Sequence, residues 1–157
     1  MHNNKSVRRV KEFLAQQQVD YKIVFLPDSA RTAKEAADAI RCTIEQIAKS
    51  IVFIGKGTKT TYLIIASGVN RIDEKKVAKK IKEPLEMATA DEVRELTGFV
   101  IGGVAPVGHT QQVTVLIDKD LFAHENIWAA AGHPKAVFEL TPADLETLTQ
   151  GKVIEVS

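Results

Sequence analysis

The stretch SIVFIGKGTKTTYLIIA, residues 50–66, decides the fold. Residues 50–54 and 61–66 are apolar at nearly every position, a pattern typical of strands that are covered on both faces. The segment between them, Gly55-Lys56-Gly57-Thr58-Lys59, has the composition of a hairpin loop. The stretch therefore predicts two adjacent strands at the centre of a sheet, around which the rest of the chain packs.

Capping residues mark where helices begin outside this hairpin. Threonine stands three positions before a glutamate or glutamine, the pattern of a capping box, at Thr32, Thr43 and Thr89. Asp73 is expected to cap a further helix, and Thr141 precedes Pro142, a residue favoured at the first helical position. The helix that begins at Thr43 is expected to be short and to end near Ala48.

The remaining elements complete an alternating pattern. Further strands are expected over residues 21–26, 99–104, 113–117, 127–131, 136–140 and 153–156. The first helix is expected to bury Val7, Val10 and Leu14, while its basic residues, Arg9 among them, face largely toward solvent. These elements predict a single α/β (α+β) domain, residues 1–157, with a mixed sheet. The patterns do not reveal the order of the strands.

Composition and charge narrow the class of protein. Hydrophobic residues make up 45% and charged residues 26% of the chain, which is typical of a globular protein. The 21 basic and 20 acidic residues nearly balance, which excludes a protein that coats long stretches of nucleic acid but allows a local basic patch. The single cysteine excludes an internal disulfide framework. The N-terminus lacks an apolar signal core and no apolar run is long enough to span a bilayer, so we expect a cytoplasmic protein without a membrane partner.

The segment Gly102-Gly103-Val104-Ala105-Pro106-Val107-Gly108 is the first candidate site. Adjacent glycines permit positive φ angles and let a ligand approach the backbone, because no Cβ is in the way. Pro106 restricts the turn and keeps Ala105 out of helical geometry. Such a loop can direct backbone N–H groups at a carbonyl or a developing oxyanion. The alternative is a simple turn between two strands.

Lys49 is the second candidate, between the predicted short helix and the first central strand. A cation at that point can hold a phosphate or a carboxylate. The alternative is a lysine whose stem covers apolar surface while its ammonium group reaches water.

The remaining residues with reactive or ligand-binding side chains give weaker indications of a functional site. His109 follows the glycine loop and His133 follows Gly132, so each is a candidate to line a cleft, with a hydrogen-bonded structural role as the alternative. Cys42 has no adjacent histidine, which favours a structural thiol over a nucleophile. No metal-ligand spacing, Walker loop or nucleophile elbow is present in the sequence. Basic residues between Arg71 and Lys82 form either a modest electrostatic footprint or a solvated helix face.

Taken in order, these segments resemble the YbaK and prolyl-tRNA synthetase-associated editing family of free-standing aminoacyl-tRNA deacylases, over roughly residues 20–156. The matching segments are 48–53 (AKSIVF), 64–68 (IIASG) with the basic helix after it, 89–93 (TADEV), 102–108 (GGVAPVG), 115–118 (VLID), 129–132 (AAAG) and 137–145 (VFELTPADL). The combination of the lysine-bearing strand and the glycine loop, in that order and at that distance, is the more specific part.

The resemblance implies a compact α/β domain with a barrel-like mixed sheet and a cleft. It implies that Lys49 lies at the nucleotide end of the substrate and that Gly102 and Gly103, with Val104, Ala105 and Pro106, surround the aminoacyl carbonyl. The further substrate-binding positions that we expect are Tyr21, Ser67, Gly68, Asp118, Gly132 and His133. Ala105 stands where relatives often have serine and Asn70 where they often have aspartate, so a hydroxyl and a charge are absent at those positions.

The implied activity is hydrolysis of the ester that joins a wrong amino acid to the terminal adenosine of a tRNA, without a metal, a cofactor or a protein nucleophile. The expected partners are the acceptor end of an aminoacyl-tRNA and, in addition, an aminoacyl-tRNA synthetase. The first alternative is a non-catalytic module that binds a tRNA acceptor end or a synthetase through the basic stretch. The second is a thiol hydrolase that uses Cys42.

Overall fold

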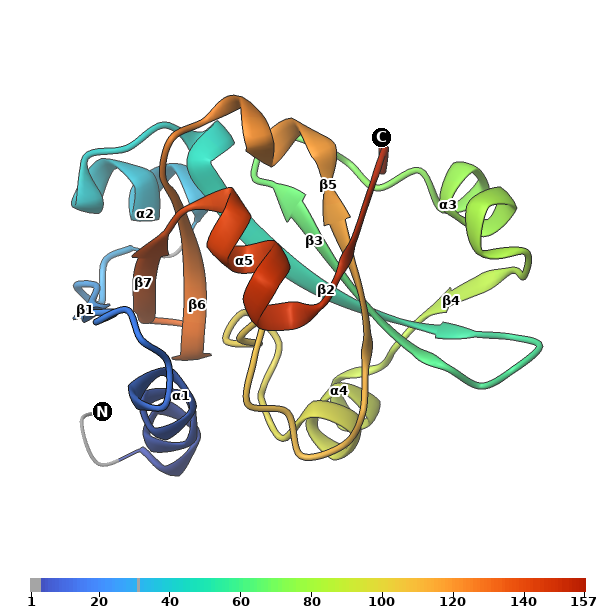
Figure 1. Ribbon diagram of the computed structural model, residues 1–157, viewed down its shortest axis with the longest axis horizontal. Coiled ribbons are helices and arrows are strands. Elements are labelled where there is room, and N and C mark those ends of the chain that lie inside the picture. The colour runs from blue at the N-terminus through green and yellow to red at the C-terminus, as the bar shows by residue number, and fades with distance from the viewer. Residues whose placement is uncertain (1–3, 31) are drawn as a thin grey trace.

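The computed structural model of the protein describes residues 4–30 and 32–157. Along the chain its helices are α1 (Lys5–Ala15), α2 (Ala33–Ile40), the 3₁₀ helix η1 (Ile44–Gln46), α3 (Glu74–Ile81), α4 (Ala90–Thr97), the 3₁₀ helix η2 (Lys119–Ala123) and α5 (Pro142–Thr149). Its strands are β1 (Ile23–Phe25), β2 (Ile47–Gly55), β3 (Thr61–Ser67), β4 (Leu85–Met87), β5 (Thr114–Asp118), β6 (Ile127–His133), β7 (Ala136–Leu140) and β8 (Lys152–Ile154). The arrangement is a mixed α/β fold, as the sequence predicts (Figure 1).

One mixed sheet contains all eight strands, in the order β1-β7-β6-β2-β3-β5-β8, with β4 added beside β2. The predicted hairpin is confirmed: β2 and β3 pair antiparallel over Ala48–Ile54 and Thr61–Ser67. Every residue of β3 is buried, because β2 and β5 flank it and apolar clusters cover both of its faces. The prediction of central strands covered on both faces therefore holds for β3.

The capping residues act largely as predicted. Thr32 and Thr89 each accept from the N–H three residues on, within complete capping boxes, and Asp73 accepts from Lys76 N–H. A helix cap of this kind contributes about 0.5–2 kcal/mol to helix stability. Val7, Val10 and Leu14 of α1 are buried as expected, but Arg9 is only half-exposed and its guanidinium points into the molecule, contrary to expectation.

Besides shifts of a few residues at the ends of several strands, three elements differ from the sequence-based predictions. Residues 99–104 form no strand, because a turn closed by the Gly103 N–H and the Val100 carbonyl interrupts the run. The helix after Thr43 is a single 3₁₀ turn, so β2 begins at Ile47 and Lys49 lies inside the strand rather than before it. The sequence analysis missed β4, whose Glu86 and Met87 are exposed at the sheet edge and leave no alternating pattern to detect.

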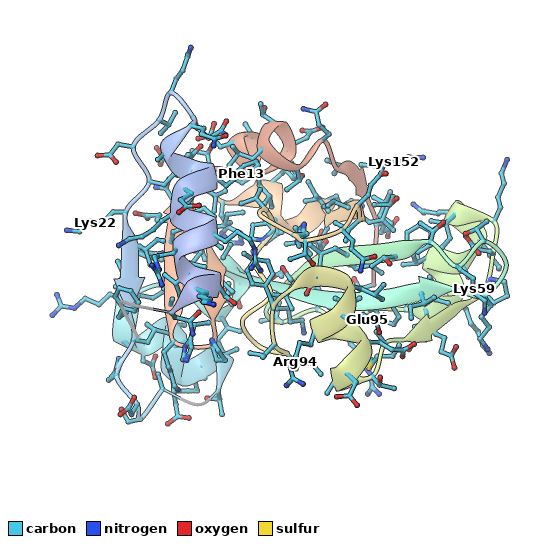
Figure 2. The ribbon with its side chains drawn as sticks, turned by 90° about the horizontal axis from the view of Figure 1, so that it is seen from below. Phe13, Lys22, Lys59, Arg94, Glu95 and Lys152 are labelled. Atoms are coloured by element: carbon cyan, nitrogen blue, oxygen red, sulfur yellow. The ribbon has the colours of Figure 1, made fainter. Side chains whose placement is uncertain are left out.

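Glu83 ties the far end of the β2–β3 hairpin to the segment before β4. Its carboxylate accepts from the N–H groups of Gly57 and Thr58 at 2.9 Å each and from the hydroxyls of Thr58 and Tyr62 at 2.7 Å each. Figure 2 shows Lys59 at this end of the molecule, away from α1. The backbone N–H of Thr58 is the largest cause that lowers the pKa of Glu83 to about 2.

Replacing Glu83 with glutamine tests this anchor. The folded-state pKa of about 2 lies below the ordinary 4.5, so the anchor stabilises the fold above about pH 4.5 and is lost as the pH falls toward about 2. We expect Glu83→Gln to lower the thermal midpoint of unfolding at neutral pH. The difference in thermal midpoint between the variant and wild type should become smaller as the solution is acidified. Glu86→Gln, on exposed β4, is the matched control. A difference in thermal midpoint that stays constant across that pH range would contradict the role of Glu83 as an anchor.

Candidate functional site

The site begins where two strands part. β2 and β6 pair in parallel only at Ile47–Trp128 and Ala48–Ala129, and Lys49 is the next residue along β2. On the same edge β2 is paired again at Phe53, with Met87 of β4. Within the part of the chain that the structure describes, no strand pairs with this edge at residues 49–51, and at Val52 the carbonyl accepts from the Ala88 N–H just after β4. The sheet therefore has a gap along one edge of β2.

The segment of residues 98–108 between α4 and β5, which contains the glycine loop at 102–108, lies beside this gap. In both views this segment lies between α1 and α4, and in Figure 1 it reaches toward the end of β6. A Cβ on Gly103 would lie 2.8 Å from the His133 Cα, so only glycine fits against the β6–β7 turn. Gly102 has a φ of 88°, which L side chains rarely adopt, although its Cβ position has ordinary space beside Pro134. The two glycines are thus required for different reasons, close approach at Gly103 and backbone conformation at Gly102.

A small cavity of about 100 Å³ lies between the gap and the loop. Its lining is mostly apolar and comes from β2, the end of β4, α4 and the loop: Ser50, Ile51, Val52, Met87, Ala88, Val93, Ile101 and Val104. Three consecutive residues of β2 line it, although successive side chains on a strand point to opposite faces. The cavity therefore runs along the edge of β2, and the lysine-bearing strand and the glycine loop share one hollow.

Ser50 supplies a polar group to this lining. Its Oγ is buried and has no hydrogen-bond partner among the described residues. Leaving a hydroxyl buried and unpaired costs about 1–3 kcal/mol, so such groups in native proteins call for an explanation. Ser50 is one of the residues that line the cavity, although its hydroxyl itself is covered.

Lys49 does not line the cavity itself. It is half-buried on β2 opposite Ala66 of β3, and it projects from the same face of the strand as Ile51, which does line the cavity. Its backbone lies at the point where β6 leaves β2, at one end of the gap. The arrangement can hold an anionic group at that end and a small apolar group within the cavity.

The loop is braced from behind by α1 and by His109. His109 Nε2 lies 2.7 Å from the carbonyl of Ala105, which makes that nitrogen the protonated donor, and its ring meets Phe99 edge-on. Burial is the main cause that lowers the pKa of His109, and the nearby charge of Arg9 adds to the effect. For His109 the structure thus shows the hydrogen-bonded structural role. Val104, Ala105 and Pro106 are buried beneath the exposed tip at Ile101 and Gly102.

Other predicted site residues stabilise the ends of strands near Lys49. The buried Asp118 carboxylate accepts from Ser67 N–H at 3.0 Å and from the Asn70 amide at 2.8 Å. Gly68 packs so tightly that a Cβ would lie 2.4 Å from the carbonyl of Ile44. Ser67, Gly68 and Asp118 thus join β3, β5 and η1 beside the start of β2, and none of them lines the cavity.

Tyr21 and Gly132 make contacts away from the loop tip. The Tyr21 hydroxyl donates to Asp144 at 2.9 Å, and burial is the largest cause that raises its pKa to about 12. Gly132 has a φ of 98° and approaches α1 so closely that a Cβ would lie 2.7 Å from the carbonyl of Ser6. His133 lies in the turn that Gly103 touches, and its Nδ1 accepts from Lys135 N–H. Of these three positions, only His133 is brought to the glycine loop.

The structure also bears on the thiol alternative. Burial is the main cause that raises the pKa of Cys42, and the charge of Glu139 adds to it, so the reactive thiolate is disfavoured.

Among the described residues no group of three or more histidine, cysteine, aspartate or glutamate side chains could hold a metal ion. No helix in residues 4–30 or 32–157 has both the length and the apolar character that a membrane span requires.

Sequence reasoning missed several residues of the site. Ile51, Met87, Val93 and Ile101 are ordinary apolar residues in sequence, and only their gathering around one cavity marks them. Arg9 is more than ninety positions away from the loop carbonyl that it binds at Gly108, so no local pattern could reveal it. Ser50 is the first residue of the quoted stretch 50–66, directly after Lys49, and a lone hydroxyl in an apolar strand was the available clue.

The fold and the site together define a class: a mixed α/β domain with a small cavity between a lysine-bearing strand and a glycine loop. The model of the aminoacyl-tRNA editing domain matches residues 27–148, and the chain belongs to this family.

Known proteins resemble the chain over nearly its whole length. It is 32% identical over 148 residues to the uncharacterized protein YwhH of Bacillus subtilis (strain 168), covering 94% of each. It is 26% identical over 127 residues to EbsC of Enterococcus faecalis (strain ATCC 700802 / V583), a proposed Cys-tRNA(Pro)/Cys-tRNA(Cys) deacylase, covering 80% of this chain and 77% of that one. A crystal structure of a proposed trans-editing enzyme for prolyl tRNA synthetase superposes with a TM-score of 0.92 at 45% identity, covering 98% of each chain. Family membership and these relatives support a deacylase role.

His109→Gln tests the buried histidine beneath the loop. The folded-state pKa of His109 lies below the ordinary 6.5, so as the pH falls through about 6.5 the unfolded chain takes up a proton before the folded chain does. Wild-type stability from this group is therefore present above about pH 6.5 and lost below it. We expect denaturant midpoints of His109→Gln to fall less on acidification than those of wild type. His124→Gln, outside the loop, is the control, and equal losses in wild type and His109→Gln would contradict the prediction.

Proposed function

We propose that this chain is a trans-editing aminoacyl-tRNA deacylase. It hydrolyses the ester of a mischarged tRNA, tRNA(Pro) or a related tRNA, that carries a small wrong amino acid. The observation that carries the proposal is the cavity shared by the glycine loop and the segment of β2 that follows Lys49. The deacylase activity proposed for EbsC and the trans-editing role proposed for the superposed structure favour this reaction and this tRNA.

The reaction needs no nucleophile from the protein, because an aminoacyl ester is already activated toward attack by water. Water attacks the carbonyl, and a ribose hydroxyl of the substrate helps to move protons, as the family resemblance implies. The backbone N–H of Gly102 stabilises the developing oxyanion, and Lys49 holds the phosphate at the nucleotide end. Gly103 acts through its close packing, since its N–H already donates to the Val100 carbonyl. No metal, cofactor or protein nucleophile takes part in this scheme.

The cavity gives the preference for small side chains a physical basis. Its volume of about 100 Å³ and its apolar walls fit a short side chain, and Val93, Val104 and Met87 limit its length. Synthetases discriminate between side chains that differ by one methylene by only about 1–3 kcal/mol, so small wrong amino acids are the errors that need later removal. A second site that admits only small residues would remove them.

Lys49→Ala is the first test, with tRNA(Pro) charged separately with alanine, serine and cysteine as substrates. Loss of a charge-assisted contact worth about 1.5–3 kcal/mol is expected to slow deacylation about tenfold or more. Lys56→Ala, an exposed lysine of the hairpin, is the matched control and should retain wild-type rates. Equal rates for Lys49→Ala and wild type, with the fold intact by circular dichroism, would contradict the role of Lys49.

Ser50→Ala tests what the cavity recognises. If the Ser50 hydroxyl pairs with a polar side chain of the substrate, its loss removes about 1 kcal/mol from that substrate alone. We expect the ratio of seryl to alanyl ester hydrolysis to fall about fivefold, while the thermal midpoint stays level or rises because a buried unpaired hydroxyl is gone. An unchanged ratio would show that the hydroxyl does not select the substrate.

The second candidate function is a non-catalytic module that binds a tRNA acceptor end or a synthetase. The observation that favours it is the exposed basic surface of α3 and the residue after it, formed by Lys75, Lys79, Lys80 and Lys82. A filter-binding assay run beside the deacylation assay separates the two candidates. Retention of charged tRNA without hydrolysis favours the module, and hydrolysis favours the enzyme.

A further inference from the structure

We propose that Arg9 is a positioning residue that shapes the glycine loop for catalysis from the opposite side of the loop. This inference rests on the proposed deacylase function and adds a residue of α1 to it. Arg9 Nη2 donates to the carbonyl of Gly98 at 2.9 Å, and its Nε donates to the carbonyl of Gly108 at 2.7 Å. One guanidinium thus joins the two ends of the loop segment, residues 98–108.

Both ends of the loop have the backbone conformation that this bridge requires. Gly98 and Gly108 have φ angles of 81° and 80°, in the left-handed region that favours glycine. A Cβ on Gly98 would lie 2.6 Å from Arg9 Nη2, so the close approach of the guanidinium depends on glycine there. The left-handed conformation of Gly98 and Gly108 lets the chain turn at each end of the loop, and the Arg9 guanidinium joins the two ends.

The bridge is connected to the interior of the loop. The guanidinium carbon of Arg9 lies 4.6 Å from the centre of the Phe99 ring, within cation–π range. The same ring meets His109 edge-on, and the Nε2 of His109 donates to the carbonyl of Ala105. Arg9, Phe99 and His109 therefore form a continuous row of contacts from α1 to the middle of the loop, one residue from Val104 in the cavity wall.

The loop needs such a device because it has no strand partner. Among the described residues, its other hydrogen bonds are short-range ones: a turn from Gly103 N–H to the Val100 carbonyl, a closing bond from Thr110 N–H to the Thr97 carbonyl, and bonds at its start that involve Gly98 and Phe99. Ser6 Oγ of α1 adds a bond of 3.3 Å to the same Gly98 carbonyl. Oxyanion stabilisation depends on donors that are held in place before the reaction, since reorganisation during the reaction forfeits the gain. Arg9 holds the backbone of this loop in place, as hydrogen bonds between strands do in a sheet.

Only a guanidinium can make this bridge. Its donors form a rigid planar fork with delocalised charge, and its face stacks on an aromatic ring, whereas an ammonium is a compact point charge. Lysine at position 9 would keep the charge and the stem but could not reach both carbonyls and lie flat on Phe99. Arg9→Lys therefore separates the geometry of the bridge from its charge.

The test compares wild type, Arg9→Lys and Arg8→Lys, the last an exposed arginine on the same helix turn. We expect Arg9→Lys to lower kcat about tenfold or more while KM changes less than about threefold, because substrate binding survives and transition-state stabilisation does not. Hydrogen exchange of the amides of residues 100–107, without substrate, is expected to accelerate in Arg9→Lys and not in Arg8→Lys. A folded Arg9→Lys protein with kcat within about twofold of wild type would overturn the inference.

His109→Phe keeps an aromatic ring in contact with Phe99 but has no N–H to donate to the Ala105 carbonyl. This variant tests the inference if Arg9→Lys does not fold. A several-fold fall in kcat with KM retained supports the inference, and an unchanged kcat overturns it. Failure of the proposed function is seen separately, as absence of deacylation by wild type across the charged tRNAs. In that case the exchange measurement alone decides whether Arg9 holds the loop: faster exchange in Arg9→Lys supports the inference, and unchanged exchange overturns it.

Discussion

The parting of β6 from β2 after Ala48 is the constraint on which the rest of the site depends. An unpaired strand edge exposes backbone donors and acceptors that a folded protein must cover or use. Here β4 and Ala88 cover the edge again from Val52 onward, and the glycine loop lies along the part between β6 and β4. The cavity exists because a loop, unlike a strand, does not fill the space beside the edge completely.

This geometry explains why the loop is rich in glycine and why its support comes from a distance. Gly103 must pass within contact of the β6–β7 turn, which leaves no room for a side chain. The loop has no ladder to hold it, so its shape depends on side chains from α1 and on His109 beneath it. The N-terminal helix, whose buried face looks purely structural in sequence, thereby acquires a link to the site.

The absence of a catalytic triad from the sequence is consistent with the reaction that the family performs. An activated ester needs positioning and oxyanion stabilisation more than it needs a nucleophile from the protein. In the proposed scheme, fixed backbone donors in a partly apolar hollow provide both, since electrostatic interactions strengthen where water is excluded. Selectivity then depends on the walls of the hollow, where Ser50 is a hydroxyl among apolar neighbours.

The sequence by itself determined the hairpin of β2 and β3, most helix starts and the pairing of Lys49 with a glycine loop as candidates, because these depend on local patterns of polarity, capping and turn residues. It failed at residues 99–104, where an apolar run resembles a strand although Gly102 bends it into a loop. Only the tertiary structure decided the strand order, the gap beside Lys49, the cavity at Ser50 and the bridge from Arg9 to Gly98 and Gly108. These features join residues tens of positions apart, and such contacts arise from packing, which leaves no periodic trace in the chain.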